Sequence, residues 1–374
     1  MKKMRLLSLG LAIVLSSLLV ACSDDEPGQS GDSFDRNAML VNWADNIIVP
    51  GYETYVSELE DLDVAVTNFT NNPSDETLLS VRNAWFEANV AWQHIALFEI
   101  GKAEEITLIN FTNVYPTNTS DLVATIQSGT YDLASINKQD EQGLPAIEYL
   151  LYGVEEDDQS IIDLYLQETA TKPYATYLAD LTNRLEVLAQ SVLDDWKNGY
   201  RDEFVNNDGS DATSSVNKLV NDYIFYYEKH LRAGKIGIPA GVFSGQRSSE
   251  KVEGFYSGMS RELFLEGLNA MVDFFNGKSP NSNLPVEGEG LKTYLDFLNS
   301  VSEGEDLGAL INAQFVLART KAESLTDNFS EQVESDNTLM LETYDELQKN
   351  VINLKVDMLQ ALNIRVDFVD ADGD

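Results

Sequence analysis

One carboxylate stands out in the sequence because its neighbours are apolar. The stretch GLPAIEYLLYG, residues 143–153, places Glu148 among Ile, Tyr and Leu side chains. Pro145 suits the first turn of a helix, where its missing N–H costs nothing, and Gly153 suits a left-handed helix end. On such a helix Glu148 shares its face with apolar side chains that include Leu144. The spacing therefore predicts a buried acid.

A buried acid needs a partner. Burying a carboxylate alone costs several kcal/mol or forces it to take up a proton. Glu148 must therefore meet a cation, a metal ion or hydrogen-bond donors from elsewhere in the fold. Two interpretations follow: a structural ion pair with an Arg or Lys, or a ligand or acid/base carboxylate in a cleft.

A second set of candidates lies on the helix predicted from residue 74 to Gly101. Trp85, Trp92 and Glu99 are spaced by seven residues and fall along one face of that helix. Buried indole N–H groups and carboxylates require partners, so this stripe is either core or the wall of a site. His94 lies on a neighbouring face and is either a core histidine or a ligand.

The other histidine of the chain follows a run of aromatic residues in YIFYYEKHLRAGKIG. If the helix ends at Gly234, His230 lies in its last turn, where the helix dipole favours the charged imidazolium. It is then either a helix-terminal cation packed on aromatic rings or a residue at an interface between domains. In the second case the glycine-rich segment that follows brings the backbone close to a ligand.

Helical spacing recurs along the chain and strand signals are scarce, which predicts an all-α protein. The length suggests two domains, each a helical bundle, packed side by side. We expect an N-terminal bundle at residues 37–204, a linker at 205–215 and a C-terminal bundle at 216–374. The linker is the polar stretch VNNDGSDATSS. Further helical patterns are predicted at residues 39–69, 160–200 with an interruption at Lys172-Pro173, 250–276, 288–301, 305–327 and 331–363.

The N-terminus has the pattern of a secretory signal. Cationic residues precede an apolar run that is too short to span a membrane, which predicts a signal peptide at residues 1–21. The run ends in LVAC, which resembles a bacterial lipobox, and Cys22 is the only cysteine of the chain. Acyl chains on Cys22 would anchor the protein to a membrane through an acidic flexible tether at residues 22–36. We therefore expect an outer-membrane lipoprotein of the cell envelope.

The charge of the chain limits its partners. The formal net charge is −37, and residues of the predicted signal peptide contribute only cations to it. Such a protein repels nucleic acid, so we expect no nucleic-acid partner. It attracts metal cations and basic proteins weakly and without selectivity.

The GLPAIEYLLYG stretch resembles the signature of the imelysin family, in which Gly-x-His-x-x-Glu runs into an apolar helix. The segments AWFEANVAWQHIALFEIG and KIGIPAGVFSG resemble other conserved blocks of that family. The resemblance covers essentially all of the mature chain. It implies two helical-bundle domains with the signature near their interface, a classification among metallopeptidases and a link to bacterial iron uptake.

The signature carries over only in part. Gly143 and Glu148 match it, but the position of its histidine is Pro145, which cannot bind a metal or transfer a proton. A zinc peptidase needs about three protein ligands and a general base, and this chain has two histidines and no HExxH. A carboxylate-based site for a divalent metal or iron tolerates this loss better than a peptidase site does.

Three functions stay open from the sequence. The first is binding of a metal ion or metal complex in iron acquisition. The second is an active metallopeptidase in which His94 or His230 replaces the missing signature histidine. The third is a non-catalytic adaptor that docks on an outer-membrane transporter. The candidate ligand or metal-site residues are Glu148, Glu99, His230, Trp85, Trp92 and His94.

Overall fold

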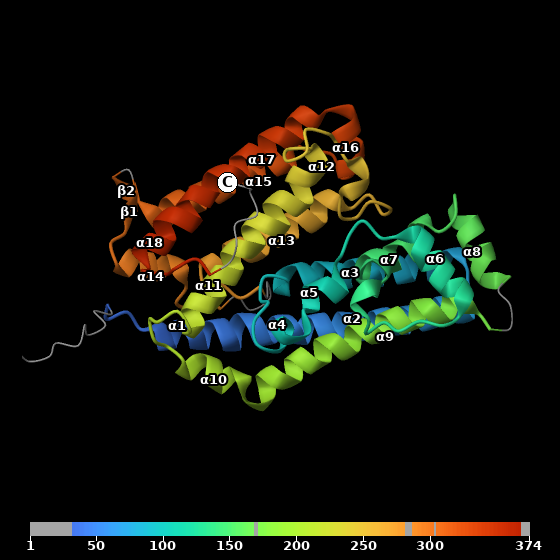
Figure 1. The fold of residues 1–374 in the computed structure, drawn as a ribbon, viewed down its shortest axis with the longest axis horizontal. Coiled ribbons are helices and arrows are strands. Elements are labelled where there is room, and N and C mark those ends of the chain that lie inside the picture. Colours follow the sequence, from blue (N-terminus) through green and yellow to red (C-terminus); the bar gives the residue numbers. More distant parts are fainter. Residues whose placement is uncertain (1–31, 168–170, 281–285, 303, 368–374) are drawn as a thin grey trace, which may run out of the picture. The chain divides into compact units, whose positions relative to one another are not determined.

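Helices make up nearly all of the regular structure (Figure 1). The computed structural model describes residues 32–167, 171–280, 286–302 and 304–367. Within these ranges the strands are two short segments, β1 (Val301–Ser302) and β2 (Glu305–Asp306), paired antiparallel. The predicted all-α class is confirmed. The predicted signal peptide, the lipidation site Cys22 and most of the tether lie outside the described residues.

The helices of the first half of the chain are α1 (Arg36–Asn42), α2 (Val49–Asn71), α3 (Asp75–Ile95), α4 (Lys102–Ile106), α5 (Leu108–Thr112), α6 (Thr119–Ser128), α7 (Gly143–Glu148), α8 (Asp158–Leu166), α9 (Pro173–Asp195) and α10 (Arg201–Asn206). Those of the second half are α11 (Ser215–Phe225), α12 (Ile238–Ala240), α13 (Ser260–Phe275), α14 (Leu291–Phe297), α15 (Leu307–Glu323), α16 (Phe329–Ser335), α17 (Asn337–Val351) and α18 (Leu359–Ala361).

Several helices are continued by π-helical turns, which are wider than α-helical ones. These turns are η1 (Trp43–Ile48), η3 (Tyr149–Gly153), η5 (Tyr226–Gly237) and η7 (Ile352–Met358), whereas η4 (Trp196–Tyr200) is a kink at Gly199, which has φ 149°. Two short 3₁₀ segments, η2 (Ile136–Glu141) and η6 (Ser249–Lys251), occur in connections.

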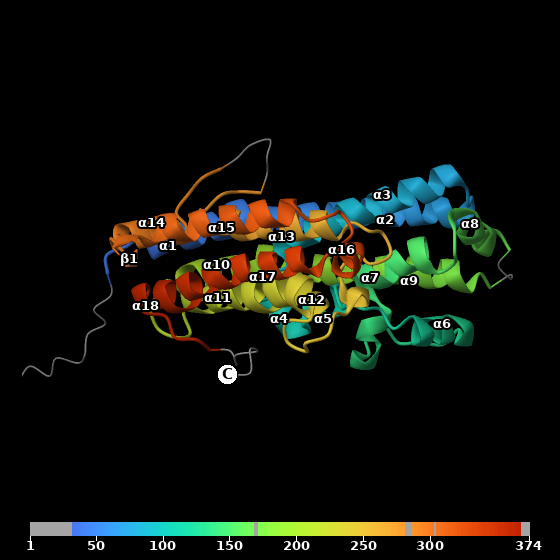
Figure 2. The same cartoon turned by 90° about the horizontal axis from the view of Figure 1, so that it is seen from above.

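The first helix set consists of α2, α3 and α9, in which α2 packs lengthwise against both α3 and α9 (Figures 1 and 2). Apolar residues recur at helical spacing on their inner faces, for example Leu59, Leu62 and Val66 on α2, and all three are buried. The Ser74 hydroxyl accepts from the Thr77 N–H in a capping box, which starts α3 where the sequence predicted. Capping and apolar spacing together set this half of the fold.

The second helix set consists of η5, α13, α15 and α17. It lies above the first set in Figure 1, and α13 packs against α3 between the two sets. The residues from Ser33 to Asp374 form one compact unit. The loop between α10 and α11 falls within the predicted linker at residues 205–215. The division into domains at 37–204 and 216–374 stays a prediction.

The helix predicted at residues 250–276 is shorter in the structure than in the sequence pattern. α13 begins at Ser260, so the predicted helix at 250–276 is wrong for its first ten residues. Gly254 and Gly258 have φ values of 68° and 72° there, which bend the chain into turns instead. Among the described residues, no helix has the length and apolar character needed to cross a membrane.

Candidate functional site

Helix α7 carries the signature stretch, and a glycine determines where it can start. Gly143 has φ +81°, and a Cβ built on it would lie 2.3 Å from the Thr112 carbonyl oxygen. Only glycine fits a left-handed conformation this close to another backbone. Pro145 is buried in the first turn, as predicted. The left-handed residue is therefore at the start of the helix, and the prediction of a left-handed Gly153 at its end is wrong.

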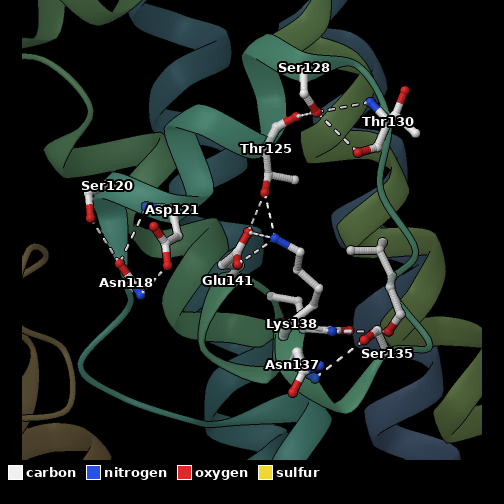
Figure 3. Close-up of polar contacts among 12 residues, drawn as sticks. Asn118, Ser120, Asp121, Thr125, Ser128, Thr130, Ser135, Asn137, Lys138 and Glu141 are labelled. Atoms are coloured by element: carbon white, nitrogen blue, oxygen red, sulfur yellow. Dashed lines mark hydrogen bonds and ion pairs between the residues drawn. The ribbon is translucent and has the colours of Figure 1, made fainter.

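The segment before α7 is held by a small polar cluster (Figure 3). Lys138 Nζ donates to Glu141 Oε1 at 2.7 Å, and the Thr125 hydroxyl donates to Glu141 Oε2 at 2.5 Å. The Tyr177 hydroxyl of α9 donates to the Glu141 carbonyl at 2.9 Å. These bonds place the chain two residues before Gly143 and so position the start of α7.

The Glu148 carboxylate is buried, with 3% of the residue exposed. Its Oε1 accepts the backbone N–H of Tyr256 at 3.0 Å and that of Ser257 at 2.7 Å. In the part of the chain that the structure describes, no Lys or Arg forms an ion pair with it. Desolvation raises the pKa of Glu148 to about 7, while the hydrogen bonds from Ser257 and Tyr256 act in the opposite direction. The hydrogen-bond partners of the buried acid are therefore Tyr256 and Ser257, in the second half of the chain.

Trp85 belongs to the surroundings of Glu148, whereas Trp92 does not. The Trp85 indole N–H donates to the Leu144 carbonyl at 2.9 Å and so ties α3 to α7. Trp92 packs against the Tyr55 ring at 5.6 Å, and within the described residues its N–H has no hydrogen-bond partner. One indole positions the signature helix and the other fills the core.

Glu99 does not continue the tryptophan stripe. The prediction placed it on the helix of Trp85 and Trp92, but α3 ends at Ile95. Both carboxylate oxygens of Glu99 lie 3.4 Å from the Ile109 amide nitrogen. Burial raises the pKa of Glu99 to about 8, and the nearby Glu104 adds to the shift. The seven-residue spacing therefore does not place Glu99 on the face of Trp85 and Trp92, because the helix ends before it.

The two histidines lie in separate environments. His94 Nε2 lies 3.1 Å from Glu266 Oε2 of α13, so it bridges the two helix sets as a partly buried residue. His230 packs against the Tyr226 and Phe225 rings, each with centroids 5.7 Å away. No contact joins either histidine to Glu148 in the described structure.

His230 also differs from its predicted charge state. The helical path does not end at Gly234, because η5 continues to Gly237 and α12 follows. His230 therefore has no helix end beside it to favour the imidazolium. Burial lowers the pKa of His230 to about 4, and the charges of Lys235 and Lys229 add to the shift. The neutral imidazole is the stable form at neutral pH.

Sequence reasoning missed a second buried carboxylate near Glu148. Glu253 is 3% exposed and forms an ion pair with Lys235, which is equally buried. Glu253 Oε1 accepts from Gln93 Nε2 at 3.0 Å and from Asn113 Nδ2 at 2.6 Å. Lys235 Nζ also donates to Gln93 Oε1 at 2.9 Å. No periodic signal marks these residues, because their partners come from distant parts of the chain.

The donor set does not fit a metal centre at Glu148. Two backbone N–H groups occupy Oε1 of its carboxylate. Across the described ranges, no group of three or more His, Cys, Asp or Glu side chains is placed to hold a metal ion. Pro145 supplies no ligand at the position of the signature histidine. The described residues thus give Glu148 hydrogen-bond donors and no group of side chains that completes a metal site.

Comparisons with known proteins agree with this fold. The family profile described as Imelysin matches residues 48–354. A crystal structure of an iron-regulated protein A precursor from Parabacteroides distasonis is similar with a TM-score of 0.70 at 15% identity, covering 88% of this chain and 97% of that one. An imelysin-like protein from Psychrobacter arcticum is similar with a TM-score of 0.67 at 16% identity, covering 89% and 97%. No curated protein matches the chain.

Proposed function

The chain belongs to the imelysin family, and from this premise we propose that it is a non-catalytic lipoprotein of the cell envelope that acts in iron acquisition as an adaptor of an outer-membrane transporter. The observation that carries the proposal is the engagement of Glu148. The one acid of the signature is taken up by backbone N–H groups in the interior. Among the described residues, no group of three or more His, Cys, Asp or Glu side chains accompanies it that could hold a metal ion.

Two further observations support this proposal. The signature histidine is replaced by Pro145, and His94 and His230 are each engaged away from Glu148. A similar fold is described as an iron-regulated protein precursor, which supports a role in iron acquisition for this chain. The predicted lipid at Cys22 would hold the protein at the membrane that carries the transporter.

The adaptor role is tested by purification from membranes of iron-starved cells. We expect the full-length protein to copurify with an outer-membrane transporter that mass spectrometry identifies. A Cys22→Ser variant should lose the membrane fraction and the transporter together. Zinc- or iron-dependent cleavage of a protein substrate by the wild type, abolished by Glu148→Gln, would refute the non-catalytic role.

Binding of iron or another divalent metal is the second candidate function. The observation that favours it is the charge: 62 acidic against 25 basic residues create a field that concentrates cations. The test is the metal content of the purified protein and its affinity for iron, zinc and calcium, in the wild type and in Glu148→Gln. Stoichiometric metal that is lost in the variant would favour this function over the adaptor.

A further inference from the structure

The segment at residues 252–259 lies between η6 and α13 and contacts the signature helix. It contains both residues whose N–H groups bind Glu148, and it also contains Glu253. Its two positive-φ glycines make its path irregular, so its backbone cannot satisfy its own polar groups as a helix would. We call residues 252–259 the clasp.

One side of the clasp is held by α7 and η3. Glu148 Oε1 accepts two consecutive N–H groups of the clasp, from Tyr256 and Ser257. The Tyr256 ring packs on Gly153, where a Cβ would lie 2.1 Å from the ring, and contacts the Tyr149 ring at 5.2 Å. Gly153 is thus required for the close approach of the clasp.

The other side of the clasp is held by the buried Glu253. Its carboxylate accepts from Gln93 of α3 and Asn113 of the loop after α5, both in the first half of the chain. It also pairs with Lys235 of η5, in the second half. One clasp residue therefore links both halves of the chain at a single carboxylate.

We propose that residues 252–259 form a conformational lock that holds the signature helix to the second helix set, with Glu148 as its internal tie and not as a metal ligand. In this lock the carboxylate of the signature acid, Glu148, accepts hydrogen bonds from N–H groups of its own chain. Loss of these bonds would expose Glu148 and release α7 from the clasp. The inference goes beyond the adaptor role and does not depend on it.

The experiment is amide hydrogen exchange of the full-length protein, read by mass spectrometry in peptides that cover the clasp. Glu148→Ala removes the acceptor, and we expect exchange in the clasp to rise at least tenfold while peptides from α15 and α17 keep their wild-type rates. Glu148→Gln keeps an acceptor oxygen and should restore most of the protection. Glu155→Gln, an exposed acid beyond η3, is the matched control and should change nothing.

Two results would overturn the lock. The first is unchanged exchange in the clasp of Glu148→Ala, or a rise that is equal in every helix. The second comes from titration with zinc and iron(II): a tenfold loss of affinity in Glu148→Gln, with clasp protection intact, would make Glu148 a ligand. Gly153→Ala places a Cβ against the Tyr256 ring of the clasp. This variant should raise amide exchange in the clasp, and it tests the lock even if Glu148→Ala fails to fold.

Discussion

Two regions of this protein place carboxylates between segments that are distant in sequence, fully buried in one and partly buried in the other. Their surroundings differ. At the clasp, Glu148 and Glu253 each face hydrogen-bond donors, and Glu253 also faces a cation. At the second region, Asp222 of α11 faces other acids. Burial raises its pKa to about 8, with further contributions from the charges of Glu104, Asp367 and Glu99.

The difference shows that burial of a carboxylate does not by itself indicate a functional site, because the surrounding donors and charges also matter. Desolvation raises the pKa of Glu148 and of Asp222 alike, but only Glu148 has donors that act against the rise. Around Asp222 the one opposing charge is Lys218, and no hydrogen bond to its carboxylate is present in the described structure. The carboxylates at the clasp thus have hydrogen-bond or ion-pair partners. Asp222 is instead surrounded mainly by other acidic side chains, which repel its charged form.

We expect the largest loss of stability when the cation that pairs with Glu253 in the clasp is removed. Lys235→Met leaves the buried Glu253 without an ion-pair partner, and we expect a loss of about 3–5 kcal/mol in the free energy of unfolding. Urea unfolding followed by circular dichroism measures this loss. Lys229→Met, at an exposed position of the same segment, is the control. A loss below about 1 kcal/mol would mean that the pair contributes little beyond its hydrogen bonds.

A change at Gly143 tests how the signature helix is placed beside the clasp. Gly143→Ala combines a left-handed backbone with a Cβ against the Thr112 carbonyl, and we expect a loss of roughly 2–4 kcal/mol. Gly129→Ala separates the two causes, because Gly129 has φ +63° and open space around it. Equal losses at the two positions, again from urea unfolding, would exclude a role for the close approach.

A smaller effect is expected at the indole that ties α3 to α7. Trp85→Phe removes the donor to the Leu144 carbonyl and should cost about 1–3 kcal/mol, because a buried acceptor is left unpaired. Trp92→Phe removes an N–H that has no partner in the described residues, so it should cost less. Thermal unfolding of both variants gives the comparison. A larger loss in Trp92→Phe would contradict the assignment.

The smallest effect comes from relieving the repulsion at Asp222. Its pKa is higher in the folded than in the unfolded protein, so the folded state binds the proton more tightly and stability falls as pH rises towards about 8. Asp222→Asn should flatten this fall and add on the order of 1 kcal/mol at pH 9, since partial exposure screens the charges. The readout is the melting temperature from pH 5 to 9. If the melting temperature of Asp222→Asn fell more steeply with pH than that of the wild type, the assignment of this repulsion to Asp222 would be wrong.

Local rules predicted much of the helical fold. Apolar spacing located α2, α3 and α9, and the cap at Ser74 marked the start of α3. The burial of Glu148 also followed from its neighbours in the sequence. These features depend on residues within one or two helical turns, which is the range over which spacing and capping act.

The contacts of the site could not be predicted in the same way. The donors to Glu148 lie 108 and 109 residues further along the chain, and the Gln93–Glu253 bond spans 160 residues. They come from an irregular segment, at residues 252–259, whose first part the periodicity predicted as helix. The error at Glu99 has the same origin, because a face extrapolated past Ile95 has no helix to lie on.

The π-helical turns affect where the chain can tolerate the deletion of a residue. A single π-helical turn such as η1 contains one residue more than an α-helical repeat requires. Deleting one residue from Trp43–Ile48 would restore the ordinary repeat, whereas a deletion inside α2 would rotate everything beyond it by about 100°. Single-residue deletions should therefore be tolerated at these wide turns and rejected within the long helices that they extend.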